Sequence, residues 1–454
     1  MPKKKTALTI EERLQQALVP AEEQPYEVPE NWVWVRLGDV NKYISKSVNP
    51  ISEPDKIFEL YSVPSMVDNY PEIIAGSDIG SSKQSVCKKD VLLCKINPRI
   101  NRVWKVSQFT DNELIASSEW IVIRNNHIDA NYLMYCFQSK YFREFMLSNV
   151  SGVGGSLMRA QPKYVQTYPI PLPPLSEQQR IVERIEELFA KLDEAKERLQ
   201  EVAESFAVRK AAILHKAFTG KLTKQWRREN GVSDESWEEK KGEDFFEYVT
   251  SGSRGWAKYY SDKGSIFVRM GNLNHGTIEL DFSDIQYVEL PDQVEGQRSK
   301  LQKNDILISI TADVGMIGLV REDMDAYINQ HVALARPKND LYAEFLAWYF
   351  VSDVGLQQMQ NKQRGATKIG LGLQDIRSII LKIPTLSEQH EIVRLIDDLL
   401  ARERAAQQAT EQALASIDLM KKSILARAFR GELGTNKASE ASALELLKQV
   451  LAEN

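Results

Sequence analysis

The chain has little cysteine, no excess of positive charge and no long apolar run. Its three cysteines, Cys87, Cys94 and Cys136, form no CxxC motif and no Cys/His pair at metal-ligand spacing. A disulfide framework or a zinc site is therefore not expected, and a reducing cytoplasm is the expected location. No apolar stretch reaches the roughly 18 residues that a membrane-spanning helix needs. The net charge of −5 argues against a protein that binds nucleic acid through bulk positive charge.

Signatures of catalysis are also missing. The sequence has no Walker-type phosphate loop and no GxGxxG motif. The Pro173-Pro174 pair lacks the preceding Asn or Asp with which an adenine methyltransferase holds its target amino group. No cluster of carboxylates with a lysine, as a nuclease needs, stands out. The histidines follow no nucleophile or ligand pattern and are expected to be structural or exposed: His127, His215, His275, His331 and His390. We therefore expect no catalytic activity in this chain.

An internal repeat is the most informative feature that is present. The motif LSEQ at residues 175–178 recurs at 386–389, an offset of 211, and the ungapped match continues to the AFxG motif at the far end of each segment. Weaker echoes precede each helix, such as KKDVLLCKI at 88–96 against KNDILISIT at 303–311. The duplication therefore covers nearly the whole chain. Each copy is a variable block followed by a long, better-matched helix.

The repeated segments are predicted to be long helices that pair with each other. In the first, apolar residues step by four and three residues as in a heptad seam, from Ile181 to Phe206 through Ala195 and Val202. Ser176 with Gln179 predicts an N-terminal capping box, and Gly220 predicts the C-terminal stop. The second seam is poorer, with Glu403 and Thr410 on seam positions.

The two helices are expected to be antiparallel, or related by pseudo-twofold symmetry, if the variable blocks are to lie at opposite ends. The residues expected in this pairing are Ile181, Ile185, Leu188, Leu192, Leu199, Phe206, Ile392, Ile396, Leu399, Ile417 and Ile424. The alternative is that each helix packs only on its own block.

Each variable block is predicted to be an α+β domain. The runs VLLCKI, WIVIR, SIFVRM and DILISI have β-rich composition and turn signals at their ends. A helical stretch then closes each block, YLMYCFQSKYFREFML and EFLAWYFVSDVGLQQM, and a glycine-bearing loop follows. The predicted domains are 1–30 (helical extension), 31–175 (first block), 176–235 (first helix and linker), 236–386 (second block), 387–433 (second helix) and 434–454 (helical tail).

This layout resembles the specificity subunit of a type I restriction-modification enzyme. The helix openings PLPPLSEQQRIVERIEEL and IPTLSEQHEIVRLIDDLL, the helix ends KAFTGKL and RAFRGEL, and the block opening WVWVRLGDV are similar to recurrent segments of that family. The resemblance spans residues 31 to 433. It implies two target recognition domains that each read one half of a split sequence in double-stranded DNA. The helices would form an antiparallel coiled-coil spacer and dock the methyltransferase subunits.

The resemblance also implies the partners and cofactors. Two methyltransferase subunits and further restriction subunits would assemble with the chain, and no membrane would be involved. The chain itself would hold no cofactor and no metal. S-adenosylmethionine would belong to the methyltransferase partner, and ATP and Mg²⁺ to the restriction partner.

Loops of both blocks carry the side chains that DNA readout needs. Arg, Lys, Asn and Gln can reach base edges in the major groove, and cations, hydroxyls and amides can reach phosphates. The candidates in the first block are Lys83, Gln84, Lys95, Arg99, Asn101, Arg102, Arg159 and Lys163. Those in the second block are Arg254, Arg269, Asn272, Arg298, Lys300, Arg364, Thr367 and Lys368. For any one of them the alternative is a solvated surface charge.

The charge balance of the two blocks differs. Residues 31–175 carry 16 basic and 13 acidic side chains, whereas residues 236–386 carry 17 and 21. We therefore expect the chain alone to bind DNA weakly. A coiled-coil scaffold without sequence readout would explain the acidity, but it would not require two divergent blocks with loop arginines.

Overall fold

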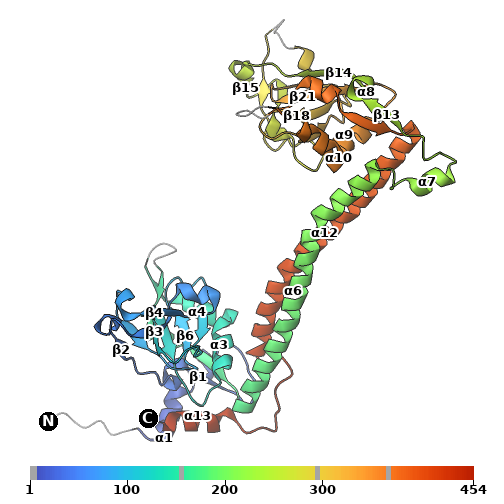
Figure 1. Ribbon diagram of the computed structural model, residues 1–454. Helices are drawn as coiled ribbons and strands as arrows, with labels where there is room; N and C mark the ends of the chain where they lie inside the picture. The colour runs from blue at the N-terminus through green and yellow to red at the C-terminus, as the bar shows by residue number, and fades with distance from the viewer. Residues whose placement is uncertain (1–7, 153–157, 292–296, 365–369, 454) are drawn as a thin grey trace. The chain divides into compact units, whose positions relative to one another are not determined.

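The computed structural model describes residues 8–152, 158–291, 297–364 and 370–453. The chain divides into two compact units: unit 1 comprises residues 1–198 and 413–454, and unit 2 comprises residues 199–412. The division runs through both long helices, α6 (Leu175–Phe218) and α12 (Leu386–Ala428) (Figure 1). Each unit therefore holds one variable block and a part of each long helix.

Unit 1 contains a five-stranded sheet of order β2-β5-β8-β3-β4 and a three-stranded sheet of order β7-β6-β9. Its helices and strands besides α6 and α12 are α1 (Ile10–Ala17), β1 (Val33–Arg36), α2 (Leu37–Val40), β2 (Ser47–Val48), β3 (Ile57–Tyr61), β4 (Glu72–Ala75), β5 (Lys83–Ser85), β6 (Val91–Cys94), β7 (Val103–Lys105), β8 (Glu113–Ala116), β9 (Trp120–Ile123), α3 (Ala130–Gln138), α4 (Lys140–Ser148), β10 (Val150–Ser151), β11 (Arg159–Ala160), α5 (Pro162–Val165), β12 (Pro169–Leu172) and α13 (Ala443–Ala452).

Unit 2 contains two four-stranded sheets, of order β14-β21-β18-β19 and β15-β17-β16-β20. Its elements are α7 (Lys224–Glu229), β13 (Glu238–Lys241), α8 (Gly242–Phe245), β14 (Phe246–Ser251), β15 (Tyr260–Ser261), β16 (Ser265–Val268), β17 (Tyr287–Val288), β18 (Ile306–Ser309), β19 (Ile317–Leu319), β20 (Ala326–Ile328), β21 (Val332–Pro337), α9 (Ala343–Val351), α10 (Asp353–Asn361), α11 (Leu373–Arg377) and β22 (Ile380–Ile383).

The two blocks share a topology. The parallel pair β3–β8 of unit 1 corresponds to the parallel pair β16–β20 of unit 2. The antiparallel pair β6–β9 corresponds in the same way to β18–β21. Each of the four predicted β-rich runs holds one of the strands β6, β9, β16 and β18. The α+β prediction for both blocks is therefore confirmed.

The helical stretch that closes each block is divided into two helices. The sequence pattern suggested one continuous stretch. Ser139 separates α3 from α4, and Ser352 separates α9 from α10; both have extended backbone, with ψ of 150° and 159°. Each serine hydroxyl accepts a hydrogen bond from the third residue of the helix that follows, at 3.3 Å. An N-cap serine with extended backbone starts a new helix. The apolar pattern runs across this break and conceals it.

The long helices are antiparallel. In unit 1 the early part of α6, with Ile181 and Ile185, shares a core with Leu425 near the end of α12. In unit 2 the late part of α6, with Leu214, shares a core with Ile392 near the start of α12. The predicted antiparallel coiled coil is thus confirmed. The alternative in which each helix packs only on its own block is wrong.

The regular heptad seam is not maintained along α6. Ala195 is exposed and Val202 is 39% exposed, whereas Lys196 and Ala203 are half-buried. A straight α-helix has 3.6 residues per turn, so a strict 3.5-residue pattern drifts off the contact face unless the helices supercoil. The residues named for the pairing are all at least partly shielded from solvent. Ile181, Ile185, Phe206, Ile392, Ile396 and Ile417 are buried, and Leu188, Leu192, Leu199, Leu399 and Ile424 are half-buried.

Two polar residues do occupy the contact face of α12, as predicted. Thr410 is 7% exposed, and its hydroxyl donates to the Ala406 carbonyl oxygen at 2.8 Å. Glu403 accepts a hydrogen bond from Arg209 Nε at 2.9 Å. Both polar groups are therefore paired, which allows them to lie between the helices.

The repeated LSEQ motif joins each long helix to its block. Gln178 Nε2 donates to the Pro173 carbonyl oxygen at 2.9 Å, and its Oε1 accepts from the Asp129 N–H at the start of α3. Gln389 makes the same two bonds, to Pro384 and to Tyr342 at the start of α9. The predicted capping box is wrong, because α6 begins at Leu175 and Ser176 therefore lies inside the helix.

The glutamate of the motif has a different partner set in each unit. Glu177, fully buried, accepts from Trp32 Nε1 at 2.7 Å and from Asn436 Nδ2 at 2.9 Å. Burial raises the pKa of Glu177 above its ordinary value. Glu388, also fully buried, accepts from Thr223 Oγ1 at 2.7 Å and from Arg227 Nη1 at 2.6 Å. In both units the donors include residues that follow the end of the partner helix, so this glutamate connects the two helices.

Both long helices stop at a glycine, as the sequence predicted for the first of them. Gly220 and Gly431 have φ of +71° and +74°, in the left-handed region. A side chain would be strained there, and at Gly431 a Cβ atom would also lie 2.4 Å from Pro29 Cγ.

A matched pair of tryptophans tests the glutamate contact. Trp32 and Trp237 each stand directly before the first strand of a block, but only Trp32 Nε1 has a hydrogen-bond partner among the described residues. Trp32→Phe is expected to lower the free energy of unfolding of unit 1 by about 1–3 kcal/mol more than Trp237→Phe lowers that of unit 2. Denaturant unfolding of both variants measures the difference. Equal effects would contradict the assigned role of the Trp32 bond.

Candidate nucleic-acid interface

Three segments far apart in the sequence meet at the end of β6 in the first block. The Lys95 N–H donates to the Glu119 carbonyl oxygen at 3.0 Å, and the Ala160 N–H donates to the Lys95 carbonyl oxygen at 2.8 Å. Ile96 pairs with Arg159 in an antiparallel bridge. We call residues 95–97, 117–120 and 159–160 the first junction.

The second block has the same arrangement at the end of β18. The Ile310 N–H donates to the His331 carbonyl oxygen at 3.0 Å, and the Leu371 N–H donates to the Ile310 carbonyl oxygen at 2.9 Å. Thr311 pairs with Gly370 in an antiparallel bridge. We call residues 310–312, 329–332 and 370–371 the second junction. The two junctions therefore have matching backbone hydrogen bonds.

A strained residue marks the same point in both junctions. Asn97 has φ of +43° and Ala312 has φ of +61°. Residues other than glycine rarely adopt this left-handed conformation, which costs about 1–3 kcal/mol and is concentrated at functional sites. The two junctions therefore also share this backbone conformation.

The side chains at matched positions of the two junctions differ. Lys95, Ile96, Ser118, Glu119 and Arg159 of the first junction correspond to Ile310, Thr311, Gln330, His331 and Gly370 of the second. The backbone frame is thus shared, while the donors, acceptors and charges that it presents are not.

The first junction is built around a carboxylate. Lys95 Nζ donates to the Ser118 carbonyl oxygen at 2.7 Å and lies 4.0 Å from Glu119 Oε2. Arg159 Nη2 lies 3.2 Å from Glu119 Oε1, and the Arg159 side chain is 55% exposed. A partly exposed cation held by a carboxylate is suited to contact guanine or phosphate. The junction thus brings together two of the predicted residues, Lys95 and Arg159.

Other predicted residues of the first block have structural roles. Gln84 Nε2 donates to the carbonyl oxygens of Ser117 and Trp120, and Asn101 Nδ2 donates to that of Gln138. Lys83 Nζ donates to Ser81, and burial lowers the pKa of this lysine. Each of these three residues thus has a hydrogen-bond partner within the block, and its contact with DNA stays a prediction.

The remaining candidates of the first block lie on its surface or near it. Arg99 is exposed, and its carbonyl oxygen accepts a hydrogen bond from Arg143. Arg102 is half-buried near Cys94, and exposed Lys163 lies over the Tyr164 ring at 4.7 Å. These cations are available for phosphate contacts.

In the second block, the prediction that Asn272 contacts DNA is wrong. Asn272 is 3% exposed; its Oδ1 accepts from the Arg269 N–H, and its Nδ2 donates to the carbonyl oxygens of Asp281 and Asp284. It shapes the loop after β16 and presents nothing to a ligand. An asparagine that folds a loop and one that reads DNA look identical in a sequence.

The other candidates of the second block are mostly exposed, and several are paired with carboxylates. Arg269, Lys300 and Arg364 pair with Asp284, Asp325 and Asp375 at 2.8, 3.2 and 3.1 Å. The hydrogen bond that Lys300 donates to Asp325 raises the pKa of this lysine. Arg254 and Arg298 are exposed. Thr367 and Lys368 lie outside the described residues.

Three residues of the second junction were missed by sequence reasoning. The side chains of Thr311, His331 and Gln330 are joined by hydrogen bonds. Thr311 Oγ1 lies 2.6 Å from His331 Nδ1, and His331 Nε2 lies 2.9 Å from Gln330 Nε2. His331 was expected to be structural or exposed. The signal that would have found the cluster is the weak repeat that matches the strand before each junction.

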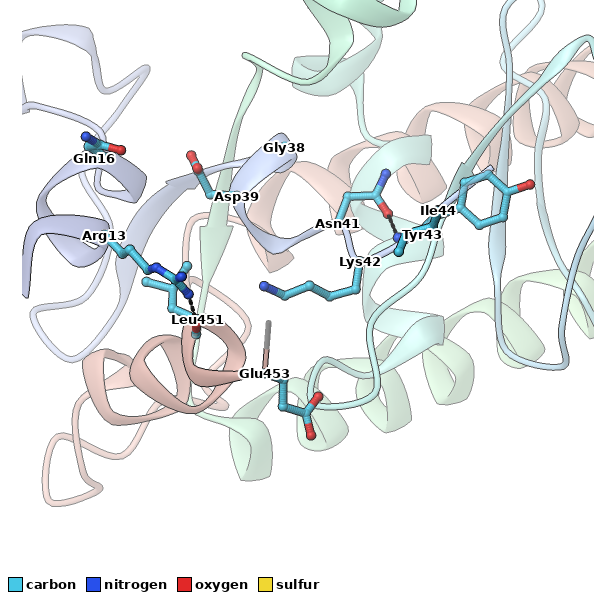
Figure 2. Close-up of a pocket in the computed structure, with 10 residues that line it drawn as sticks. All are labelled: Arg13, Gln16, Gly38, Asp39, Asn41, Lys42, Tyr43, Ile44, Leu451 and Glu453. Atoms are coloured by element: carbon cyan, nitrogen blue, oxygen red, sulfur yellow. Dashed lines mark hydrogen bonds between the residues drawn. The ribbon is translucent and has the colours of Figure 1, made fainter. Parts of the chain in front are cut away.

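A separate cavity of about 600 Å³ lies among α1, α2 and the end of the chain in unit 1. Figure 2 shows the Lys42 side chain reaching into it, with Arg13 donating to the Leu451 carbonyl oxygen. Burial lowers the pKa of Lys42 and raises that of Asp39. Two cations and two carboxylates, Arg13, Lys42, Asp39 and Glu453, line the cavity, so it has no charge preference for a nucleic acid.

Two further kinds of feature are absent from the described residues. Among the described residues, no group of three or more His, Cys, Asp and Glu side chains is arranged to hold a metal ion. Within the same residues, no helix combines the length and apolar character needed to cross a membrane.

Comparison with known proteins gives a consistent match. A family model described as the type I restriction modification DNA specificity domain matches residues 29–204 and 234–414. The chain is 30% identical over 306 residues to the specificity subunit of the type I restriction enzyme EcoBI of Escherichia coli, covering 63% of this chain and 64% of that protein. It is 28% identical over 345 residues to the EcoKI specificity subunit of E. coli strain K12, covering 72% of each.

A solved structure has the same fold. The HsdS subunit from Thermoanaerobacter tengcongensis superposes with a TM-score of 0.67 at 22% sequence identity, covering 90% of this chain and all of that one. At this identity the likeness concerns the fold alone.

Proposed function

The chain belongs to the type I restriction-modification DNA specificity family, and on that premise we propose that it is the DNA sequence-specificity subunit of such a complex. Each block reads one half of a split target in double-stranded DNA. The paired helices set the spacing between the halves and dock the methyltransferase subunits, two per chain. Restriction subunits join through this assembly.

The observation that carries the proposal is the pair of junctions. Their backbone hydrogen bonds match, whereas their side chains differ at five matched positions. Specific readout requires different donors and acceptors for different bases on a frame of fixed geometry. A scaffold without readout would need neither the shared frame nor its different side chains.

The chemistry is assigned to the partners. S-adenosylmethionine is used by the methyltransferase, and ATP with Mg²⁺ by the restriction subunit; the chain itself contributes no cofactor and no catalytic group. Its excess of acidic side chains, a net charge of −5, opposes phosphate binding. The partner subunits are therefore expected to supply much of the affinity for DNA, while this chain supplies the sequence preference.

Exchange of one block tests the proposal. The chain with its methyltransferase subunits and S-adenosylmethionine is expected to methylate a split motif, and replacing residues 31–170 by the corresponding block of a related subunit is expected to change one half of that motif only. Sequencing of methylated genomic DNA gives the motif. The chain without the methyltransferase serves as the control and is expected to methylate nothing. A change in both halves, or methylation by the chain alone, would contradict the proposal.

A further inference from the structure

We infer that Gln330 is a base-reading residue of the second block and that it recognises adenine. The inference rests on the proposed function and goes beyond it, because it names one side chain and one base. It starts from the chain of hydrogen bonds formed by Thr311, His331 and Gln330 at the second junction.

The hydrogen bonds determine the state of the histidine. Gln330 Nε2 can only donate, so His331 Nε2, 2.9 Å away, accepts and carries no proton. His331 is then neutral with its proton on Nδ1, which donates to Thr311 Oγ1 at 2.6 Å. The backbone N–H of His331 donates to Asn329 Oδ1 at 3.0 Å. The ring is thus held from both sides, and it fixes the orientation of the Gln330 amide.

Half of the Gln330 amide remains free. One N–H is used by His331, and no other hydrogen bond joins the Gln330 amide to a described residue. Gln330 and Thr311 are both partly exposed. We take the N–H that points away from Oε1 as the one bonded to His331; the other N–H and Oε1 then form one donor–acceptor edge at the surface of the junction.

This pattern complements one base in particular. In the major groove adenine offers the N7 acceptor beside the N6 amino donor, and a glutamine amide pairs with both. Guanine offers two acceptors at the corresponding positions, so it would leave Oε1 facing another acceptor. A fixed N–H and C=O pair therefore selects adenine.

The matched positions of the first junction offer a different chemistry. Ser118 and Glu119 stand where the second junction has Gln330 and His331, and Glu119 is paired with Arg159 at 3.2 Å. The first junction has no amide at the matched position. Variants of Gln330 should accordingly affect only the half-site that the second block reads.

Replacement of Gln330 in the full chain, with its methyltransferase subunits, tests the inference. Gln330→Ala is expected to relax one A·T position in one half of the motif, with roughly a 10- to 100-fold loss of discrimination. Gln330→Glu, which keeps the size but only accepts, is expected to disfavour adenine at that position. The readout is the methylated motif of each variant, together with its thermal unfolding.

Two controls accompany these variants. Gln302→Ala changes an exposed glutamine of the same unit and should leave the motif unchanged. Ser118→Ala changes the matched position of the first junction and should leave the half read by the second block unchanged.

The outcomes separate the inference from the proposed function. A motif unchanged in both Gln330 variants, or relaxed at a G·C position, would overturn the role of Gln330 while leaving the proposed function standing. A wild-type complex that methylates no split motif would overturn the proposed function itself. If Gln330→Ala loses its base preference at one position while its thermal unfolding is unchanged, Gln330 reads that base. A purely structural role would instead lower the stability and leave the base preference unchanged.

Discussion

A chain that ends at Glu440 is expected to lose the stable fold of unit 1. The deletion removes α13, which buries Leu446, Leu447, Val450 and Leu451 in the unit 1 core at 8%, 0%, 0% and 4% exposure. Burial of four such side chains contributes about 6–12 kcal/mol at 1.5–3 kcal/mol each. That is of the same order as the roughly 5–15 kcal/mol by which a whole domain is stable.

The helix is also bound to the start of the chain. The Ala443 N–H donates to the Asn31 carbonyl oxygen, and Arg13 donates to the Leu451 carbonyl oxygen at 3.0 Å. Deletion would leave these groups without partners and uncover the apolar face of α1. Local repair of the core is therefore not expected.

Hydrogen exchange measures the effect region by region. Protection should fall throughout unit 1 and persist in the sheets of unit 2. Leu447→Ala should reproduce part of the loss, about 2–5 kcal/mol, whereas Gln449→Ala, at an exposed position of the same helix, should change stability by less than about 0.5 kcal/mol. Full protection of unit 1 in the shortened chain would contradict the role assigned to α13.

A second large effect is expected at the buried ion pair of unit 2: Arg336→Met should lower the free energy of unfolding by about 3–5 kcal/mol. Asp305 is fully buried and accepts from Arg336 Nε at 2.7 Å and from Nη2 at 2.8 Å. Removing the guanidinium leaves an uncompensated carboxylate in the interior. Asp90 and Arg124 form the same two-bonded pair in unit 1, so the aspartate shared by KKD and KND has one structural role in both blocks.

The pH dependence follows from the same carboxylate. Burial already raises the pKa of Asp305 above its ordinary value. Without Arg336 that pKa should rise further, because the opposing positive charge is gone. When the folded-state pKa of a carboxyl group is raised, its ionised form destabilises the folded state. This destabilisation is present above the raised pKa and disappears when the group is protonated at lower pH. The deficit of Arg336→Met relative to the wild-type chain should therefore shrink as the pH is lowered.

Two comparisons make the test specific. In Asp305→Asn combined with Arg336→Met the buried charge is absent and the amide can still accept from the Gln302 N–H, so more than half of the lost stability should return. Arg394→Met removes an exposed arginine that pairs with Glu391 and Asp398, and should cost less than about 1 kcal/mol. Similar losses of unfolding free energy in Arg336→Met and Arg394→Met would show that the buried pair contributes no more to stability than an exposed pair.

The sequence by itself determined the duplication, the α+β blocks, the long helices and the glycine that ends the first of them. These features depend on local patterns: apolar residues at helical spacing, β-branched runs and residues that permit a left-handed backbone. The same patterns carried the family resemblance. They also concealed the breaks at Ser139 and Ser352, because a serine cap occupies a single position within a continuing apolar pattern.

Only the tertiary structure decided which polar side chains are available to a ligand. Gln84, Asn101 and Asn272 have the chemistry of base readers, yet their amides bond to carbonyl groups of other segments. Thr311 and His331 stand twenty residues apart and meet because β18 and β21 pair. A hydrogen-bonding side chain is equally suited to backbone or to DNA, and the choice depends on which segments the fold places beside it.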